Sequence, residues 1–303
     1  MNRPPHHRRD APTMLGICLV MFVLLLPAAC GKSSAADRDP LVINGKRIDD
    51  GGVEEWDLPA AGEAAPDPVA APAGGPLRPD KRSSSGPPKV LVAGDSVAFY
   101  LSVPIVNGAK DLGITARSQA NQVCGVIKVG RIRNADGSVS DSEAGCRWPD
   151  EWAATELDTF DPDIVLIALG APPLVDLEID GEFAAPCSNR FDAWYTSRFR
   201  ALIDQLSAEG AFVAIANTAY PITFPEIPDG KRRTDCLNTD IAAAAVGRHA
   251  AVIDLLNFTC PNRVCSNERN GVVMRPDGIH YGPEGSNIVA AWLVPEALRA
   301  AGY

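Results

Sequence analysis

The stretch that decides the fold is Lys89-Val-Leu-Val-Ala-Gly94-Asp95-Ser96-Val97-Ala98-Phe-Tyr100. It begins with an uninterrupted apolar run, stops at a Gly-Asp-Ser turn and continues with residues that favour a helix. An apolar run without alternation is typical of a parallel strand that helices cover on both faces. In such sheets ligands bind beyond the carboxyl ends of the strands. We therefore predict that Ser96 lies at that edge, beside the amide groups of a helix start, where a nucleophile belongs.

The same alternation of apolar runs and amphipathic segments continues to the end of the chain. The pattern predicts strands at 89–94, 114–119, 163–170, 211–217 and 251–256. It predicts helices at 96–112, 148–160, 190–209, 234–249 and 284–301. Five such units joined by right-handed crossovers make a three-layer α/β/α sandwich built on a five-stranded parallel sheet.

Residues 1–29 have the pattern of a secretory signal peptide. Basic residues precede the apolar run Met14–Leu26, which is too short for a comfortable bilayer span. The small residues that lead to Cys30 resemble a bacterial lipoprotein signal, which predicts lipidation of Cys30 and an anchor at the outer face of the membrane. Pro27 departs from that pattern, so cleavage after Ala29 and release of a secreted protein is the alternative. Either route exports the protein.

Residues 30–88 are rich in Ala, Pro and Gly and are interpreted as a disordered tether that precedes a domain at 89–303. The tether would hold that domain away from the membrane, although a dispensable linker has the same composition. Within it, Leu41–Ile48 contains the Asn44-Gly45 pair typical of a small hairpin. The net charge of −10 becomes more negative once the basic leader is removed. The mature chain therefore lacks the basic footprint that a nucleic-acid partner requires.

Six cysteines follow Cys30, and an even number in an exported chain favours disulfides. Several pairings are possible, and the sequence does not choose among them. We favour neighbours because most of these cysteines lie in loops beside expected strand ends. A zinc site is the rival interpretation, weakened by the absence of a Cys-x-x-Cys pair and by the isolation of the remaining histidines. The favoured pairs are Cys124 with Cys146, Cys187 with Cys236, and Cys260 with Cys265.

A serine nucleophile needs a base, which is usually a histidine oriented by a third group. Of the two histidines in the mature domain, His249 ends the helix before the fifth strand, at the opposite edge of the sheet, where it would satisfy helix carbonyls. His280 lies in a loop after the fifth strand, on the same edge as Ser96. Asp277 precedes it by three residues, a spacing that lets a turn bring its carboxylate to one ring nitrogen while the other faces Ser96.

Each of these residues also has a plain structural explanation. Asp95 and Ser96 could cap the helix that follows them, and Asp277 could be an ordinary turn former. Their occurrence together favours a catalytic role, because two separate turns at one sheet edge carry complementary members of a triad.

These motifs resemble the SGNH hydrolases, also called GDSL esterases. Gly94-Asp95-Ser96 matches the first family block, and Asp277-Gly278-Ile279-His280 matches the last. The resemblance covers residues 89–303 and implies a flavodoxin-like sandwich, with Ser96 as nucleophile, His280 as base and Asp277 as its orienting residue. It implies no metal or organic cofactor. Cys260-Pro261, Arg275–His280 and Gly285–Pro295 more narrowly resemble SGNH domains fused to, or partnered with, membrane acyltransferases that O-acylate cell-surface glycans.

Two family blocks match less well. Gly125 is the best candidate for the oxyanion-hole amide of the second block. The third block, Gly-x-Asn-Asp, falls on Gly170-Ala171-Pro172-Pro173, so its asparagine is absent. Proline has neither a side-chain amide nor an N–H, which removes one oxyanion donor unless another residue supplies it. The candidate substitutes are Asn121, Asn189 and Asn217.

Two classes of function follow from the sequence. The first is an exported serine esterase or O-acyltransferase that acts on acyl esters, expected to be acetyl esters, of cell-wall or surface polysaccharide. A membrane acyltransferase is a candidate partner. The alternative is a non-catalytic glycan-binding or assembly lipoprotein that keeps the fold without the chemistry. A true lipase is less favoured, because no long apolar lid segment stands out near the site.

Overall fold

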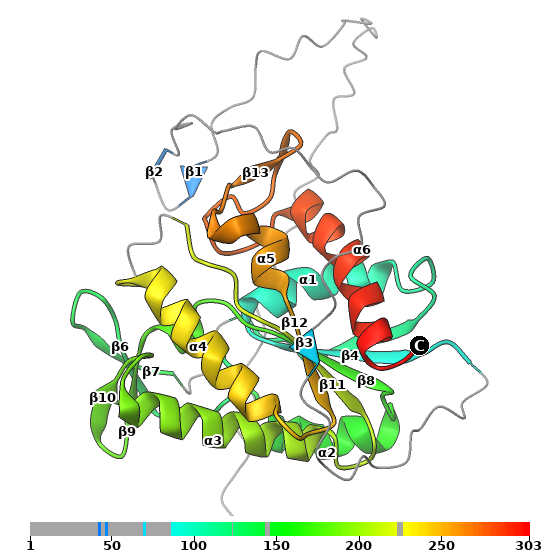
Figure 1. Ribbon diagram of the computed structural model, residues 1–303, viewed down its shortest axis with the longest axis horizontal. Coiled ribbons are helices and arrows are strands. Elements are labelled where there is room, and N and C mark those ends of the chain that lie inside the picture. Colours follow the sequence, from blue (N-terminus) through cyan, green and yellow to red (C-terminus); the bar gives the residue numbers. More distant parts are fainter. Residues whose placement is uncertain are drawn as a thin grey trace, which may run out of the picture. The chain divides into compact units, whose positions relative to one another are not determined.

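A computed structural model of the chain is shown in Figure 1. It describes residues 86–122, 124–142, 146–222 and 227–303, and the backbone of three two-residue strands at 42–43, 46–47 and 69–70. The expected signal peptide, Cys30 and most of the expected tether lie outside the described residues. The chain divides into two compact units, Met1–Ile48 and Asp49–Tyr303. In the first unit, β1 (Val42–Ile43) and β2 (Lys46–Arg47) pair antiparallel, where the sequence predicted a hairpin.

The second unit contains the predicted five-stranded parallel sheet. Its strands follow the order β12-β11-β8-β4-β5, and each neighbouring pair is parallel. In chain order this is the 2-1-3-4-5 arrangement of flavodoxin-like folds. The short β3 (Val69–Ala70) pairs antiparallel with β12 at the outer edge. The parallel strands are β4 (Lys89–Gly94), β5 (Thr115–Ser118), β8 (Ile164–Ala168), β11 (Phe212–Ala216) and β12 (Ala250–Ile253).

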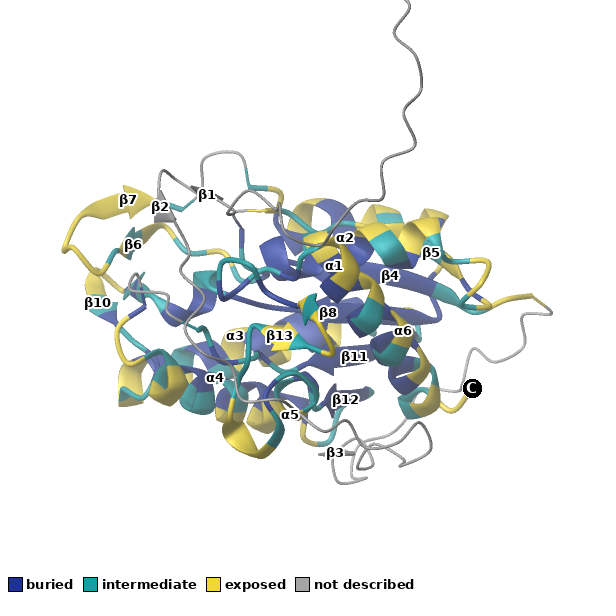
Figure 2. Cartoon of the chain, turned by 90° about the horizontal axis from the view of Figure 1, so that it is seen from above, coloured by how far each residue is buried: buried dark blue, intermediate teal, exposed yellow. Residues whose placement is uncertain are grey.

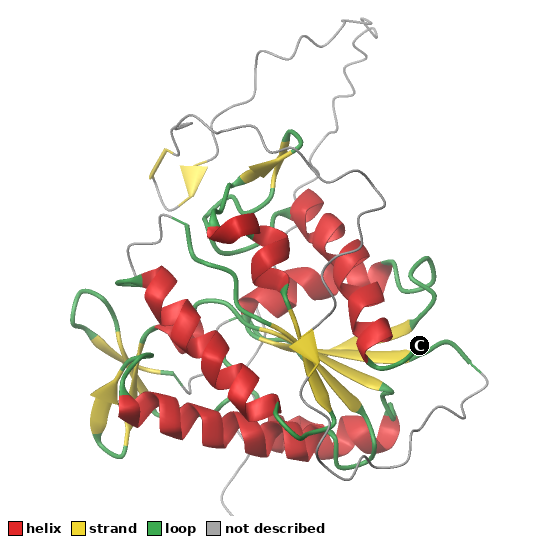
Figure 3. Cartoon of the chain, in the orientation of Figure 1, coloured by secondary structure: helices red, strands yellow, loops and turns green. Residues whose placement is uncertain are grey.

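Helices cover both faces of this sheet, as the colours of Figure 3 make plain. On one face α1 packs against α6, and on the other α3 packs against both α2 and α4. The predicted helix at 96–112 ends at Asn107, and the one predicted at 234–249 begins and ends earlier in the chain. The bounds are α1 (Ser96–Asn107), α2 (Pro149–Thr159), α3 (Asn189–Leu206), α4 (Gly230–Ala245) and α6 (Pro283–Ala300).

The core lies where the apolar runs predicted it. Every residue of β8 and β12 is buried, and Figure 2 shows the central strands in the colour of buried residues beneath partly exposed helices. α3 buries one stripe, including Phe191, Tyr195 and Phe199, whose rings stack along the helix. A continuous apolar strand and an amphipathic helix thus bury complementary faces.

A second, antiparallel sheet was not predicted. Its order is β10-β9-β6-β7, so it joins a hairpin between β5 and α2 to another between β8 and α3. Its strands are only three or four residues long, but each hairpin contains an Asp-Gly pair, Asp136-Gly137 or Asp180-Gly181, next to alternating polar and apolar residues. This is a hairpin signal that the sequence analysis missed. The strands are β6 (Arg131–Arg133), β7 (Val139–Asp141), β9 (Asp176–Ile179) and β10 (Glu182–Ala184).

The remaining elements are short. Two 3-10 turns, Pro172–Leu174 and Pro261–Arg263, follow β8 and α5. The helix α5 (Leu255–Thr259) follows β12, and the hairpin of β13 (Glu268–Arg269) and β14 (Val272–Val273) precedes the loop that carries His280.

Three disulfides join the cysteines as neighbours in sequence, which is the pairing that the sequence analysis favoured. Their sulfurs are therefore not thiolates that could bind zinc. The bonds are Cys124–Cys146, Cys187–Cys236 and Cys260–Cys265.

Candidate active site

Ser96 is the first residue of α1 and directly follows the turn after β4. The Asp95 side chain caps this helix by accepting a hydrogen bond from the Val97 N–H at 2.9 Å. Gly94 has a φ of +141°, and a Cβ there would lie 2.0 Å from the Ala168 carbonyl oxygen of β8. Only glycine allows the turn to approach the neighbouring strand so closely. The local sequence thus places the hydroxyl of Ser96 at the carboxyl edge of the sheet.

Asp95 has a second role that the sequence analysis missed. Its other carboxylate oxygen accepts a hydrogen bond from the Gly170 N–H at 2.7 Å, which ties the turn after β4 to the turn after β8. Burial raises the pKa of Asp95 to about 6, although the hydrogen bonds from Gly170 and Val97 favour its ionised form. This buried carboxyl group therefore fixes the two turns that lie next to Ser96.

The structure brings the three predicted triad residues together. His280 Nε2 lies 2.7 Å from the Ser96 hydroxyl oxygen, and His280 Nδ1 lies 2.6 Å from Asp277 Oδ2. These are hydrogen-bond distances, and they form one continuous chain from a carboxylate through an imidazole to a hydroxyl. The arrangement allows the imidazole to accept the serine proton while the carboxylate holds the ring.

Asp277 is held in its ionised form. Burial opposes ionisation, but hydrogen bonds from the His280 ring and from the Ile279 and His280 N–H groups outweigh burial and lower the pKa of Asp277 to about 2. The carboxylate is therefore negative over most of the pH range and favours a proton on Nδ1 of His280.

The loop that carries Asp277 and His280 is anchored on both sides. Arg275 is buried and donates a hydrogen bond from Nη1 to the Tyr220 carbonyl oxygen at 2.7 Å, and burial lowers the pKa of its guanidinium. Gly278 has a φ of +83°, and its carbonyl oxygen accepts a hydrogen bond from the Ile222 N–H at 2.9 Å. The loop is therefore pinned to the segment that follows β11.

Tyr100 is another neighbour of the site that sequence reasoning missed. Its ring centroid lies 5.2 Å from that of His280, and its side chain is 39% exposed. It lies one helical turn after Ser96, so its position on the same face of α1 could have been read from the spacing. Tyr100 therefore forms part of the rim around the imidazole.

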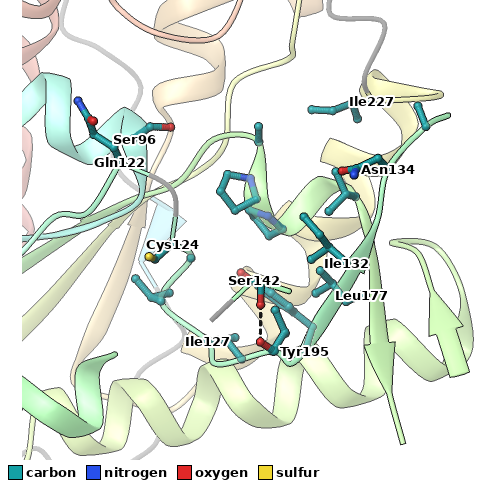
Figure 4. Close-up of a pocket in the computed structure, with 18 of the residues that line it drawn as sticks. Ser96, Gln122, Cys124, Ile127, Ile132, Asn134, Ser142, Leu177, Tyr195 and Ile227 are labelled. Carbon is teal, nitrogen blue, oxygen red and sulfur yellow. Dashed lines mark hydrogen bonds between the residues drawn. The ribbon is translucent and has the colours of Figure 1, made fainter. Parts of the chain in front are cut away.

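Ser96 and His280 line a cavity with a volume of about 1000 Å³. Gly125, predicted to supply an oxyanion amide, lines the same cavity, as do Cys124 and Pro172. Figure 4 shows Ser96, Gln122 and Cys124 around one part of this cavity. The predicted oxyanion loop thus lies on the same cavity as the nucleophile candidate.

The third family block remains without its asparagine. Pro172 and Pro173 line the cavity where that residue was expected, and none of the three substitute asparagines is among the described lining residues. The side chain of Asn217 is engaged elsewhere, because it donates to Asp254 at 2.9 Å and accepts from the Leu256 N–H at 2.7 Å. An oxyanion donor from a side-chain amide would therefore have to come from a residue other than Asn217.

Neither a metal site nor a membrane-spanning helix is found among the described residues. In that part of the chain no group of three or more His, Cys, Asp or Glu side chains is placed to hold a metal ion. Within the same residues, no helix combines the length and the apolar character needed to cross a bilayer.

No family model matches this chain. No curated protein matches it either. Solved structures do resemble it. One is a lipase/acylhydrolase from Enterococcus faecalis, with 17% identity and a TM-score of 0.40 over 69% of this chain and 94% of that one.

Two further solved structures resemble this chain at similarly low identity. A GDSL-like lipase from Bacteroides thetaiotaomicron has 15% identity and a TM-score of 0.46, covering 70% of this chain and 88% of its own. The periplasmic domain of a lipopolysaccharide acetyltransferase from Salmonella ser. Paratyphi A has 11% identity and a TM-score of 0.44, covering 71% and 84%. Identities this low describe the fold alone. The chain has structural neighbours that are described as SGNH and GDSL hydrolases.

Proposed function

We propose that this protein is an extracytoplasmic serine esterase or O-acyltransferase that acts on acyl esters of cell-surface glycans. The observation that carries the proposal is the hydrogen-bonded chain of Ser96, His280 and Asp277 at the end of an open cavity. The glycan acceptor rests on the sequence motifs, and the location is supported by three disulfides, which are typical of oxidising compartments. An anchor at Cys30 would keep the domain at the membrane, within reach of a partner acyltransferase.

In the proposed reaction, the Ser96 oxygen attacks the ester carbonyl while His280 Nε2 accepts the serine proton. The tetrahedral intermediate collapses as the imidazolium returns this proton to the leaving alcohol, and an acyl ester forms on Ser96. Water or a sugar hydroxyl then attacks that ester, again with His280 as base, and restores the free serine. The negative Asp277 stabilises the imidazolium in both halves of the reaction.

The oxyanion would be stabilised by backbone amides. The N–H of Ser96 belongs to the first turn of α1, whose N–H groups have no partner within the helix. The N–H of Gly125 is the second candidate, because Gly125 lines the same cavity. Pro172 in place of an asparagine removes a third donor, and the loss of one donor costs on the order of 10²–10³ in kcat. We therefore expect a slow enzyme.

The test is hydrolysis of p-nitrophenyl acetate by the purified domain and by Ser96→Ala. We expect the substitution to abolish turnover above the uncatalysed rate. Ser102→Ala is the matched control on the same helix, since the Ser102 hydroxyl only donates to the Phe99 carbonyl oxygen. Equal rates for the wild type and Ser96→Ala would reject the enzyme. The presence of Pro172 would then favour the alternative, a glycan-binding lipoprotein that lacks the chemistry.

A further inference from the structure

The cavity beside Ser96 is much larger than an acetyl ester requires. Its volume is about 1000 Å³, which is at the upper end of the range for sites that enclose a whole small molecule. Figure 4 shows Ser96 and Gln122 on one side and Ile132, Leu177 and Ile227 on the opposite side. The space therefore extends from the nucleophile candidate towards the small antiparallel sheet.

The far wall of the cavity is apolar. Ile132 of β6 and Leu177 of β9 are direct cross-strand neighbours, and both line the cavity. Neighbours in this register point to the same face of the sheet, so the pair presents a continuous apolar surface. The loop after Gly125 adds Ile127, and α3 adds the ring of Tyr195. An apolar surface of this kind inside a cavity indicates a binding site for an apolar group.

Several polar groups on this wall already have partners within the protein. The Asn134 side chain donates to the Ser138 hydroxyl at 3.0 Å, and the Ser142 hydroxyl donates to the Val129 carbonyl oxygen. Asp136 accepts hydrogen bonds from the N–H and the hydroxyl of Ser138. Sugar hydroxyls would lose their hydrogen bonds to water here without gaining many in return. A hydrocarbon chain has no such requirement.

We infer that this cavity binds the acyl chain of the substrate, and that the chain is a medium-length acyl group in place of acetyl. The inference rests on the proposed function and names the acyl class for the same site. The ester carbonyl would lie at Ser96 and the chain would extend towards Ile132 and Leu177. The alcohol side of the ester would then face the exposed rim near Tyr100, where a glycan can be accommodated.

Chain-length dependence tests this directly. We would measure kcat/KM for the p-nitrophenyl esters of acetate, butyrate, hexanoate and octanoate. Burial of one methylene group is equivalent to about a fourfold gain, so full burial of the six extra methylenes of octanoate would give about 4000-fold over acetate. Partial burial should still give about 100-fold or more. A kcat/KM for acetate that equals or exceeds that for octanoate would overturn the inference.

Substitution of a residue on the far wall tests where the acyl chain binds. Ile132→Asn should lower the octanoate-to-acetate ratio of kcat/KM by at least about tenfold, because it places an amide against the chain. Val139→Asn is the matched control, since Val139 lies on β7 of the same sheet, is 47% exposed and does not line the cavity. It should keep the wild-type ratio. A ratio that responds equally to both variants, or to neither, would show that the chain binds elsewhere.

Direct binding separates this inference from the proposed function. Octanoate and acetate would be titrated into Ser96→Ala, and into Ser96→Ala with Ile132→Asn, by calorimetry. We expect octanoate to bind Ser96→Ala and Ile132→Asn to weaken that binding by about tenfold. If no ester is turned over but octanoate binds in this way, the acyl-chain site is correct and the proposed enzyme activity is wrong. If acetate hydrolysis depends on Ser96 but octanoate does not bind, the enzyme stands and the acyl-chain site is wrong.

Discussion

At the scale of single residues, Asp277 determines whether His280 can act as a base. Its carboxylate accepts hydrogen bonds from the His280 ring and from the N–H groups of Ile279 and His280. These bonds lower its pKa to about 2, against the effect of burial. A depressed pKa contributes stability that is present above the ordinary value of 3.8 and is lost as the pH falls towards 2. The triad geometry should therefore persist in mild acid.

Asp277→Asn should lower kcat by about 10⁴-fold. The amide of asparagine can donate to Nδ1, which places the imidazole proton on Nε2, where the ring can no longer accept the proton of Ser96. The measurement is steady-state hydrolysis of a p-nitrophenyl ester near neutral pH. Asp158→Asn, on the exposed face of α2, is the control and should keep the wild-type rate. Retention of more than a tenth of kcat in Asp277→Asn would exclude the orienting role.

Gly278→Ala should destabilise the fold far more than the same change at another glycine with equal backbone conformation. Gly278 and Gly137 both have a φ of +83°, but a Cβ at Gly278 would lie 1.8 Å from the Ile222 carbonyl oxygen, whereas nothing lies within 4 Å at Gly137. Alanine at a left-handed position costs about 1–2 kcal/mol, so this is the expected loss for Gly137→Ala.

The clash should bring the loss for Gly278→Ala to about 3 kcal/mol or more. Urea unfolding of both variants measures the difference. Equal losses would mean that the loop tolerates a side chain and that its contact with Ile222 is not close.

At the scale of elements, two helices meet where a buried carboxyl group, Asp240, faces a partly buried one, Asp192. Asp240 of α4 is 6% exposed, and α4 packs on α3, which carries Asp192. Burial, and then the charge of Asp192, raise the pKa of Asp240 to about 7. A raised pKa contributes stability that is present below the ordinary value of 3.8 and is lost as the pH rises towards 7. The interface between α3 and α4 should therefore loosen towards neutral pH.

Asp240→Asn should remove this loss, because asparagine remains neutral. Its free energy of unfolding relative to the wild type should rise between about pH 4 and pH 7, reaching on the order of 4 kcal/mol, and then level off. Urea unfolding at several pH values measures this. Asp111→Asn, in the exposed turn after α1, is the control and should show no such trend. A difference between Asp240→Asn and the wild type that does not change with pH would contradict the assignment.

The disulfide Cys124–Cys146 holds the loop that carries Gly125. Replacement of both cysteines by serine should lower kcat/KM by about 10²-fold, because a displaced Gly125 amide cannot stabilise the oxyanion. Replacement of Cys187 and Cys236 is the matched control, since this bond anchors the start of α3 to α4 away from the cavity. It should cost about 2–4 kcal/mol of stability and leave kcat/KM unchanged below the unfolding transition.

At the scale of the whole molecule, the hydrophobic core belongs to one continuous part of the chain. Among the described residues, the core cluster runs from Val90 to Ala297, and the tether contributes only the short strand β3 at the sheet edge. A fragment that begins at Gly86 should therefore keep the ester hydrolysis rate of a chain that begins at Cys30. Its Tm should fall by no more than about 4 °C. Thermal unfolding followed by circular dichroism measures the Tm, and ester hydrolysis is compared as the rate per mole of protein. A fragment that fails to fold would show that the tether is part of the domain.

The sequence by itself determined the parallel sheet and the members of the candidate triad. Apolar runs such as the one at 163–170 specify buried strands locally, and Gly94 and Gly278 mark turns that only glycine can make. Because the carboxyl ends of parallel strands share one edge, the positions of Ser96 and His280 in the chain were enough to predict that they meet.

Only the tertiary structure decided the shape of the cavity. The pairing of Ile132 with Leu177 joins two short hairpins that are distant in sequence. Each hairpin has its own Asp-Gly turn signal, but no local pattern shows that the two hairpins pair with each other. The engagement of Asn217 with Asp254, and the second contact of Asp95 with Gly170, also depend on which loops fold next to each other. Local sequence specifies an element through its own backbone and periodicity, whereas a binding surface arises from contacts between elements that no local pattern encodes.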